Sequence, residues 1–146
     1  MKMPGAFRWL VGAVVALVLA LVVLPGLTGA RQRAESLNCA SSVVSICYAG
    51  RLWAEDHGGS FPTNFLCMSN ELATLKVLSC SPARRARASE WSDFTPDNCT
   101  YEIVTLGVHK DATNTVFLRC TIHGHLGYPN VTVFDGVRRR GKYWSL

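Results

Sequence analysis

Residues 9–30 read WLVGAVVALVLALVVLPGLTGA and contain no charged side chain. As an α-helix rising about 1.5 Å per residue, this stretch extends about 33 Å, which exceeds the roughly 30 Å hydrocarbon core of a bilayer. Its most apolar part runs from Leu10 to Leu24. The sequence therefore predicts a transmembrane anchor over residues 1–30, with lipid around it, and an exported domain over residues 31–146.

A cleaved signal peptide is the alternative interpretation of the same segment. Lys2 and Arg8 form a basic start, and the small residues 28–30 would suit a signal peptidase. We favour retention, because the apolar stretch is long for a signal peptide and the sequence after Ala30 continues as a helix. The charges on the two sides of the stretch nearly balance, so they do not set the orientation.

The cysteines indicate the compartment better than the charges do. All six follow the apolar segment in a chain of 146 residues, and a small cysteine-rich exported domain usually forms disulfides in an oxidising compartment. We therefore expect a cytoplasmic N-terminus and a periplasmic or extracellular domain. Cys39 and Cys47 cannot pair if they share a helix, because about 12 Å of rise separates them.

The excess positive charge of the domain lies in two clusters, residues 84–87 and 138–142. Neither has the interleaved aromatic residues that are typical of a nucleic-acid platform. We expect solvated loops or contact with anionic lipid here, and no nucleic-acid partner.

The periodicity predicts an α+β domain. A helix is expected over residues 31–57, kinked against the membrane segment at Pro25 and ended by Gly58-Gly59. Its apolar face carries Cys39, Val43, Ile46, Gly50 and Trp53. Beyond it, alternating segments rich in β-formers predict antiparallel strands at 75–80, 99–106, 115–121 and 131–135.

Cys120 and His123 form the sharpest local cluster, because a thiolate and an imidazole at this spacing can bind one zinc ion. No second ligand pair accompanies them, so we expect a disulfide from Cys120 beside exposed turn histidines, and neither a metal nor another cofactor. The rival hypothesis is an exported metal-binding module using Cys80, Cys99, Cys120 and His123, released by cleavage at Ala30. The sequence has no GxSxG, HExxH or phosphate-binding glycine loop, so we expect no enzyme activity.

Several short segments occur in an order that is more specific than any one of them. They are VLPGL (23–27), ARQRA (30–34), Cys39, RLWAEDH (51–57), FP (61–62), SNEL (69–72), KVLSCSP (76–82) and RCTIHGH (119–125). In these segments the chain resembles the pilin-like proteins of bacterial type II secretion and type IV pili, most closely a cysteine-containing group of pseudopilin-like proteins.

This resemblance implies a long kinked N-terminal helix, membrane-spanning in its first half, packed on a small antiparallel sheet. It also implies a structural or assembly role beside other pilin-like or secretion-system proteins. In this arrangement the candidate disulfide joins Cys80 in the first strand to Cys120 in the late turn. The partners of Cys39, Cys47, Cys67 and Cys99 stay open.

The chain departs from that family at its start. Members carry a glycine–phenylalanine cleavage site followed by a glutamate, which prepilin peptidase and fibre assembly use. Counting back from Pro25, Met3 stands at the glycine position and Arg8 at the glutamate position. We therefore expect no processing by prepilin peptidase.

Overall fold

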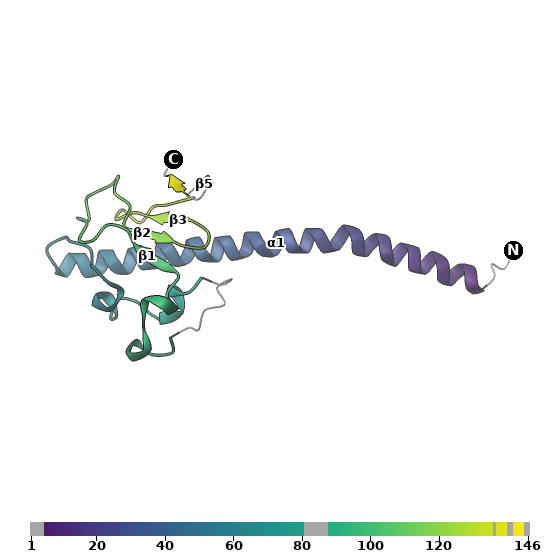
Figure 1. Ribbon diagram of the computed structural model, residues 1–146, viewed down its shortest axis with the longest axis horizontal. Coiled ribbons are helices and arrows are strands. Elements are labelled where there is room, and N and C mark those ends of the chain that lie inside the picture. The colour runs from purple at the N-terminus through teal and green to yellow at the C-terminus, as the bar shows by residue number, and fades with distance from the viewer. Residues whose placement is uncertain (1–4, 81–87, 136, 140–141, 145–146) are drawn as a thin grey trace. The chain divides into compact units, whose positions relative to one another are not determined.

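The computed structural model describes residues 5–80, 88–135, 137–139 and 142–144, and it has an α+β fold. One long helix, α1 (Gly5–Asp56), precedes a four-stranded antiparallel sheet (Figure 1). By their internal contacts the residues form two compact units, Met1–Ala34 and Glu35–Leu146. The prediction of a long helix with a small antiparallel sheet is confirmed.

In the first unit, α1 is apolar and exposed. Among the described residues it is the one helix long and apolar enough to cross a membrane. The helix is continuous through Pro25, as expected for one long helix. Its exposed large apolar side chains in this unit include Trp9, Val11, Val14, Val15, Leu17, Val18, Leu19, Leu21, Val22, Leu24 and Leu27.

In the second unit, one face of α1 is buried in the domain core. The buried positions recur at steps of three and four residues, as an amphipathic helix requires. Trp53, predicted on this face, is half-buried and packs against the core. The buried positions are Cys39, Val43, Ile46, Cys47, Ala49, Gly50 and Ala54.

The helix ends at Asp56, one residue before the predicted end. Gly58 and Gly59 both take positive φ values, 66° and 82°, which glycine adopts without a Cβ penalty. The Gly59 N–H donates to the Ala54 carbonyl at 2.8 Å, so the turn caps the last helical carbonyls.

The sheet has the strand order β1-β2-β3-β4, and every neighbouring pair is antiparallel. Its register pairs Tyr101 with Cys120 and Leu118 with Gly127. Three of its strands lie within predicted segments, and a separate hairpin, β5–β6, follows. The strands are β1 (Tyr101–Ile103), β2 (Leu118–Cys120), β3 (His125–Gly127), β4 (Val133–Asp135), β5 (Val137–Arg139) and β6 (Lys142–Trp144).

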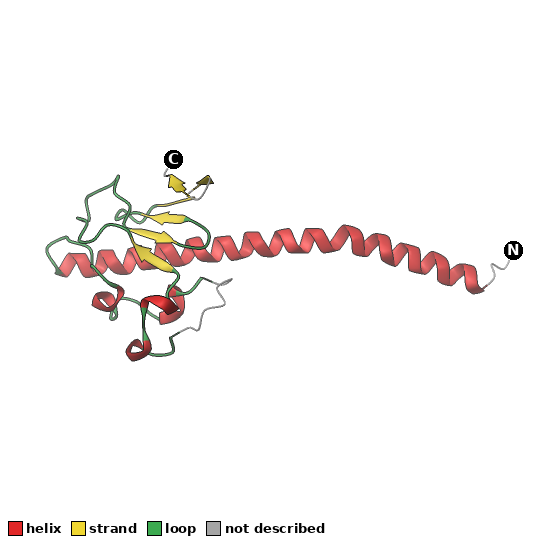
Figure 2. Ribbon diagram, viewed as in Figure 1, coloured by secondary structure: helices red, strands yellow, loops and turns green. Residues whose placement is uncertain are grey.

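Four short 3-10 turns lie among the described residues between α1 and β1 (Figure 2). The prediction of a strand at 75–80 is wrong, because residues 75–78 form such a turn. The Thr74 hydroxyl accepts the Lys76 N–H at its start, a local bond that competes with strand pairing. The turns are η1 (Phe65–Met68), η2 (Leu75–Leu78), η3 (Trp91–Asp93) and η4 (Pro96–Asn98).

The prediction of solvated loops at the two basic clusters, residues 84–87 and 138–142, is tested only at the second cluster. Residues 84–87 lie outside the described residues. The second cluster was predicted as a loop, but Arg138 and Arg139 belong to β5 and Lys142 belongs to β6.

The sheet packs on α1 through a close backbone approach at Gly127 in β3. A Cβ added to Gly127 would lie 2.5 Å from the Cys47 sulfur and 2.8 Å from a Val43 methyl. Phe61 and Phe117 pack edge-to-face beside it with ring centroids 4.6 Å apart. Both rings are buried, so they extend the core along the helix.

We predict that Gly127→Ala destabilises the domain by about 1–3 kcal/mol, because the added methyl group overpacks the helix–sheet contact. Denaturant unfolding of the full chain in detergent micelles, followed by near-ultraviolet circular dichroism, measures this change. Gly29→Ala is the matched control, since its new Cβ meets nothing within 4 Å. Equal unfolding free energies for the two variants would contradict the packing described here.

Candidate functional site

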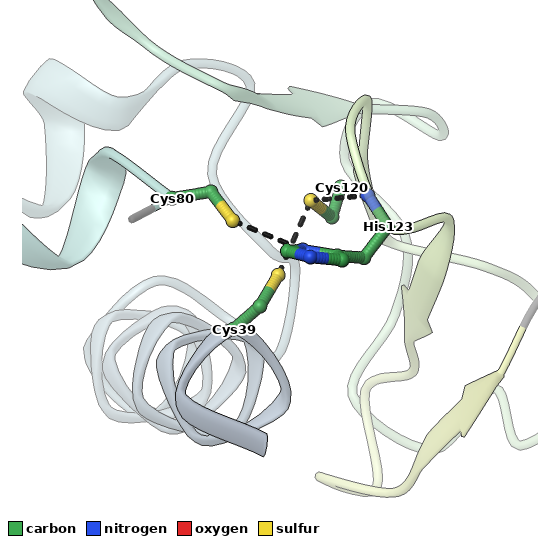
Figure 3. Close-up of side chains that lie close together, drawn as sticks. All are labelled: Cys39, Cys80, Cys120 and His123. Atoms are coloured by element: carbon green, nitrogen blue, oxygen red, sulfur yellow. Dashed lines mark hydrogen bonds between the residues drawn. The ribbon is translucent and has the colours of Figure 1, made fainter. Parts of the chain in front are cut away.

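Three thiols and one imidazole converge inside the second unit. The sulfur atoms of Cys39, Cys80 and Cys120 and a ring nitrogen of His123 all lie within 4.8 Å of one another. Figure 3 shows Cys39 on α1, Cys80 on the segment that follows η2, and Cys120 and His123 on the other side of the cluster. The three cysteines are buried and His123 is half-buried. We call these four residues the thiol–histidine cluster.

Two short contacts define the cluster. The Cys39 thiol donates to the Cys120 sulfur at 3.2 Å, and the Cys80 sulfur lies 3.1 Å from His123 Nδ1 (Figure 3). The Tyr101 hydroxyl donates to the Cys39 sulfur at 3.6 Å. Residues from α1, the segment after η2, β1, β2 and the turn after β2 therefore meet at one point.

Thr100 holds Cys80 in place. Its buried hydroxyl accepts the Cys80 N–H at 2.7 Å and donates to the Leu78 carbonyl at 3.4 Å. The Thr100 N–H also donates to that carbonyl, at 3.0 Å. The backbone around Cys80 is thus fastened to the residue that precedes β1.

The turn after β2 brings His123 back over Cys120. The Gly124 N–H donates to the Cys120 carbonyl at 3.0 Å, and Gly124 has a positive φ of 78°. The His123 N–H donates to the Cys120 sulfur at 3.4 Å. The tight turn explains why the CTIH segment offers both a sulfur and an imidazole to one space.

The electrostatics favour one ionised thiol in the cluster. The hydrogen bond from Cys39 is the main cause that lowers the pKa of Cys120, to about 5, and the backbone N–H groups of His123 and Ile122 add to it. That same bond, together with burial, raises the pKa of Cys39 far above its usual range. The shared hydrogen bond therefore favours the proton on Cys39 and the negative charge on Cys120.

This arrangement suits two kinds of chemistry. Three thiols and an imidazole are a donor set that zinc takes with tetrahedral geometry. Alternatively, Cys39 and Cys120 would form a disulfide if their sulfur atoms moved from 3.2 Å to the bond length of about 2.05 Å. The cluster is too buried for a thiolate that attacks a bulky substrate.

The structure brings together the two cysteines of the candidate disulfide, Cys80 and Cys120, but neither is in a disulfide. The same holds for Cys39, Cys47, Cys67 and Cys99. Cys39 is the cluster member for which the sequence analysis named no partner. The sequence did indicate that Cys39 is buried, because it lies on the apolar face of the predicted helix. Its distance in sequence from Cys80 and Cys120 is too long for a recognisable metal-binding motif.

Three other cysteines lie outside the cluster. The Cys99 sulfur, a ligand in the rival hypothesis, donates instead to the Tyr101 carbonyl at 3.3 Å. Cys47 is fully buried on α1, and burial raises its pKa to about 12. Cys67 is exposed.

The expectation of exposed turn histidines is wrong for both residues of this turn. His123 is half-buried in the cluster, and His125 is only 4% exposed. The His125 Nε2 atom lies 3.2 Å from the Ser36 hydroxyl and 3.1 Å from the Ser36 carbonyl. His125 therefore links β3 to α1 and contributes no donor to the cluster.

An apolar hollow of about 500 Å³ opens near the cluster. Tyr101 joins the two, because it lines the hollow and its hydroxyl contacts Cys39. The apolar part of the lining comes mainly from Phe65, Leu66, Phe94, Ile103 and Leu106. Cys99 and Glu102 also line the hollow, but none of the four residues of the thiol–histidine cluster does.

Comparison with known protein families, with curated proteins and with solved structures gave no match.

We predict that Thr100→Val destabilises the domain by about 1–3 kcal/mol, because it leaves the buried Cys80 N–H without its acceptor. Thr100→Ser keeps the hydroxyl and loses only a methyl group, so its cost is expected at about 1 kcal/mol. Denaturant unfolding of both variants measures the difference. A smaller cost for valine than for serine would rule out the positioning role of this hydroxyl.

Proposed function

We propose that the chain is a non-enzymatic, membrane-anchored protein of pilin-like architecture with a structural or assembly role. The observation that carries this proposal is the single helix α1, which is apolar and exposed before residue 30 and supplies the core of the domain after residue 38. The same helix therefore contains both the apolar segment and one buried face of the domain.

The continuity of α1 favours retention of the anchor. Cleavage at Ala30 would fall inside the helix, since Thr28 to Arg33 are all helical. A signal-peptide junction is usually an accessible, extended segment, and a cut here would leave a helix starting without its preceding turns. The released metal-binding module therefore fits this segment less well than the anchor.

The pilin-like part of the proposal is supported by where the resembling segments lie. The segment at 51–57 is the end of α1, and residues 61–62 follow its glycine turn. The segment at 119–125 includes the turn between β2 and β3. Of the residues in these segments, Ala54, Phe61, Pro62 and Cys120 are buried in the domain core.

The chain would act by contact with other proteins and with lipid. Arg8 stands where the family has its glutamate, so joining a fibre by the usual charge pairing is not part of this proposal. Contacts would instead run through the apolar helix in the membrane and through the domain surface, with other pilin-like or secretion-system proteins as partners. The N-terminus would be cytoplasmic and the domain periplasmic or extracellular.

We predict that the native protein stays in the membrane fraction through high-salt and alkaline washes, because about 20 apolar residues insert stably in a bilayer. N-terminal sequencing of the membrane and soluble fractions is the measurement. A chain starting at Met1 in the membrane supports the anchor. A chain starting at Arg31 in the soluble fraction would overturn it and favour the released module.

The alignment of the first eight residues with the pilin-like family, counted back from Pro25, gives a second prediction. When the chain is expressed with a prepilin peptidase, the wild type stays uncut, whereas the triple variant Met3→Gly, Pro4→Phe, Arg8→Glu loses its first three residues. Intact mass measures the loss. The double variant Pro4→Phe, Arg8→Glu, which lacks the glycine, is the control. An uncut triple variant would contradict the pilin-like alignment of this segment.

A further inference from the structure

The thiol–histidine cluster presents four donor atoms from distant parts of the chain. Cys39 and Cys120 are separated by 81 residues, and Cys80 and His123 by 43. Each of the three cysteines is at most 2% exposed. Three buried thiols therefore lie around one imidazole.

We propose that Cys39, Cys80, Cys120 and His123 bind one zinc ion. Ligands at about 2.3 Å for sulfur and 2.1 Å for nitrogen, placed tetrahedrally, lie about 3.5–3.8 Å from one another. The observed contacts of 3.1 Å and 3.2 Å and the upper bound of 4.8 Å bracket this range. Small side-chain adjustments therefore complete the site.

The donor set favours zinc over calcium or magnesium. Thiolates are soft ligands, and the two hard cations prefer oxygen. Three thiolates and a neutral imidazole around Zn²⁺ leave a net charge of about −1, which nearby hydrogen-bond donors reduce. Those donors are the His123 N–H toward the Cys120 sulfur and the Tyr101 hydroxyl toward the Cys39 sulfur.

A disulfide explains the cluster less completely. A bond between Cys39 and Cys120 would leave Cys80 beside His123, and a bond between Cys80 and Cys120 would leave Cys39 buried without a partner sulfur. A zinc ion uses all four donors and fills the coordination shell, which identifies the site as structural. It would tie α1 to both the η2 segment and β2, whereas a Cys80–Cys120 disulfide would not include the helix.

Metal analysis tests this assignment directly. The full chain is purified in detergent with a thiol reductant, reconstituted with zinc chloride, freed of excess metal and analysed by mass spectrometry. We expect about one zinc per chain. Cobalt chloride in place of zinc should give thiolate-to-cobalt charge-transfer bands and tetrahedral d–d bands. Binding of less than about a tenth of an equivalent would overturn the proposal.

Variants show which residues bind the metal. Cys80→Ser and His123→Ala should each lose most of the retained zinc, and the double variant Cys39→Ser, Cys120→Ser should lose all of it. Cys67→Ser, an exposed cysteine, and Cys99→Ser, a buried one, are the matched controls and should keep about one equivalent. Zinc retained by the double variant, or lost from the controls alone, would contradict the ligand set.

A measurement on the wild type covers the case in which variants fail to fold. Brief alkylation of native protein, counted by intact mass and peptide mapping, should leave Cys39, Cys80 and Cys120 unmodified with zinc and modified after chelation. A Cys39–Cys120 or Cys80–Cys120 disulfide in zinc-free protein taken from its native membrane would overturn the proposal. None of these results depends on whether the anchor is retained.

Discussion

The close approach of β3 to α1 at Gly127 is the constraint on which the rest of the domain depends. The backbone of β3 lies against Val43 and Cys47, so the sheet can rest on the helix only where a side chain is missing. β2 pairs with β3 at Gly127, so the close approach of β3 also brings β2 near the helix. Cys120 in β2 thereby comes within 3.2 Å of Cys39 on α1. The cluster is thus a result of how the sheet packs.

The helix and the class of the fold could be predicted from the sequence, because periodicity and hydropathy are local signals. The spacing of Cys39, Val43, Ile46 and Gly50 identified the buried face correctly. β3 was missed, since His125-Leu126-Gly127 has weak strand propensity and owes its conformation to pairing with β2 and β4. The strand predicted at 75–80 was wrong for the opposite reason. These residues have strand propensity, but local hydrogen bonds such as that from the Lys76 N–H to the Thr74 hydroxyl stabilise a 3-10 turn instead.

Only part of the thiol–histidine cluster could be predicted from the sequence. Cys120 and His123 are close in sequence, and their turn could be recognised from spacing alone. Cys39 and Cys80 reach the same point through tertiary packing, which no spacing rule describes. The choice of Cys99 as a ligand shows the limit of such rules, because that side chain turns toward the Tyr101 carbonyl instead.

The sequence separation of 81 residues between Cys39 and Cys120 also bears on biogenesis. Synthesis runs from the N-terminus, so Cys39 is made well before the other three donors exist. Throughout that interval its sulfur lacks the other three donors of the cluster. The cluster can therefore assemble only after most of the chain has been made, whichever chemistry finally closes it.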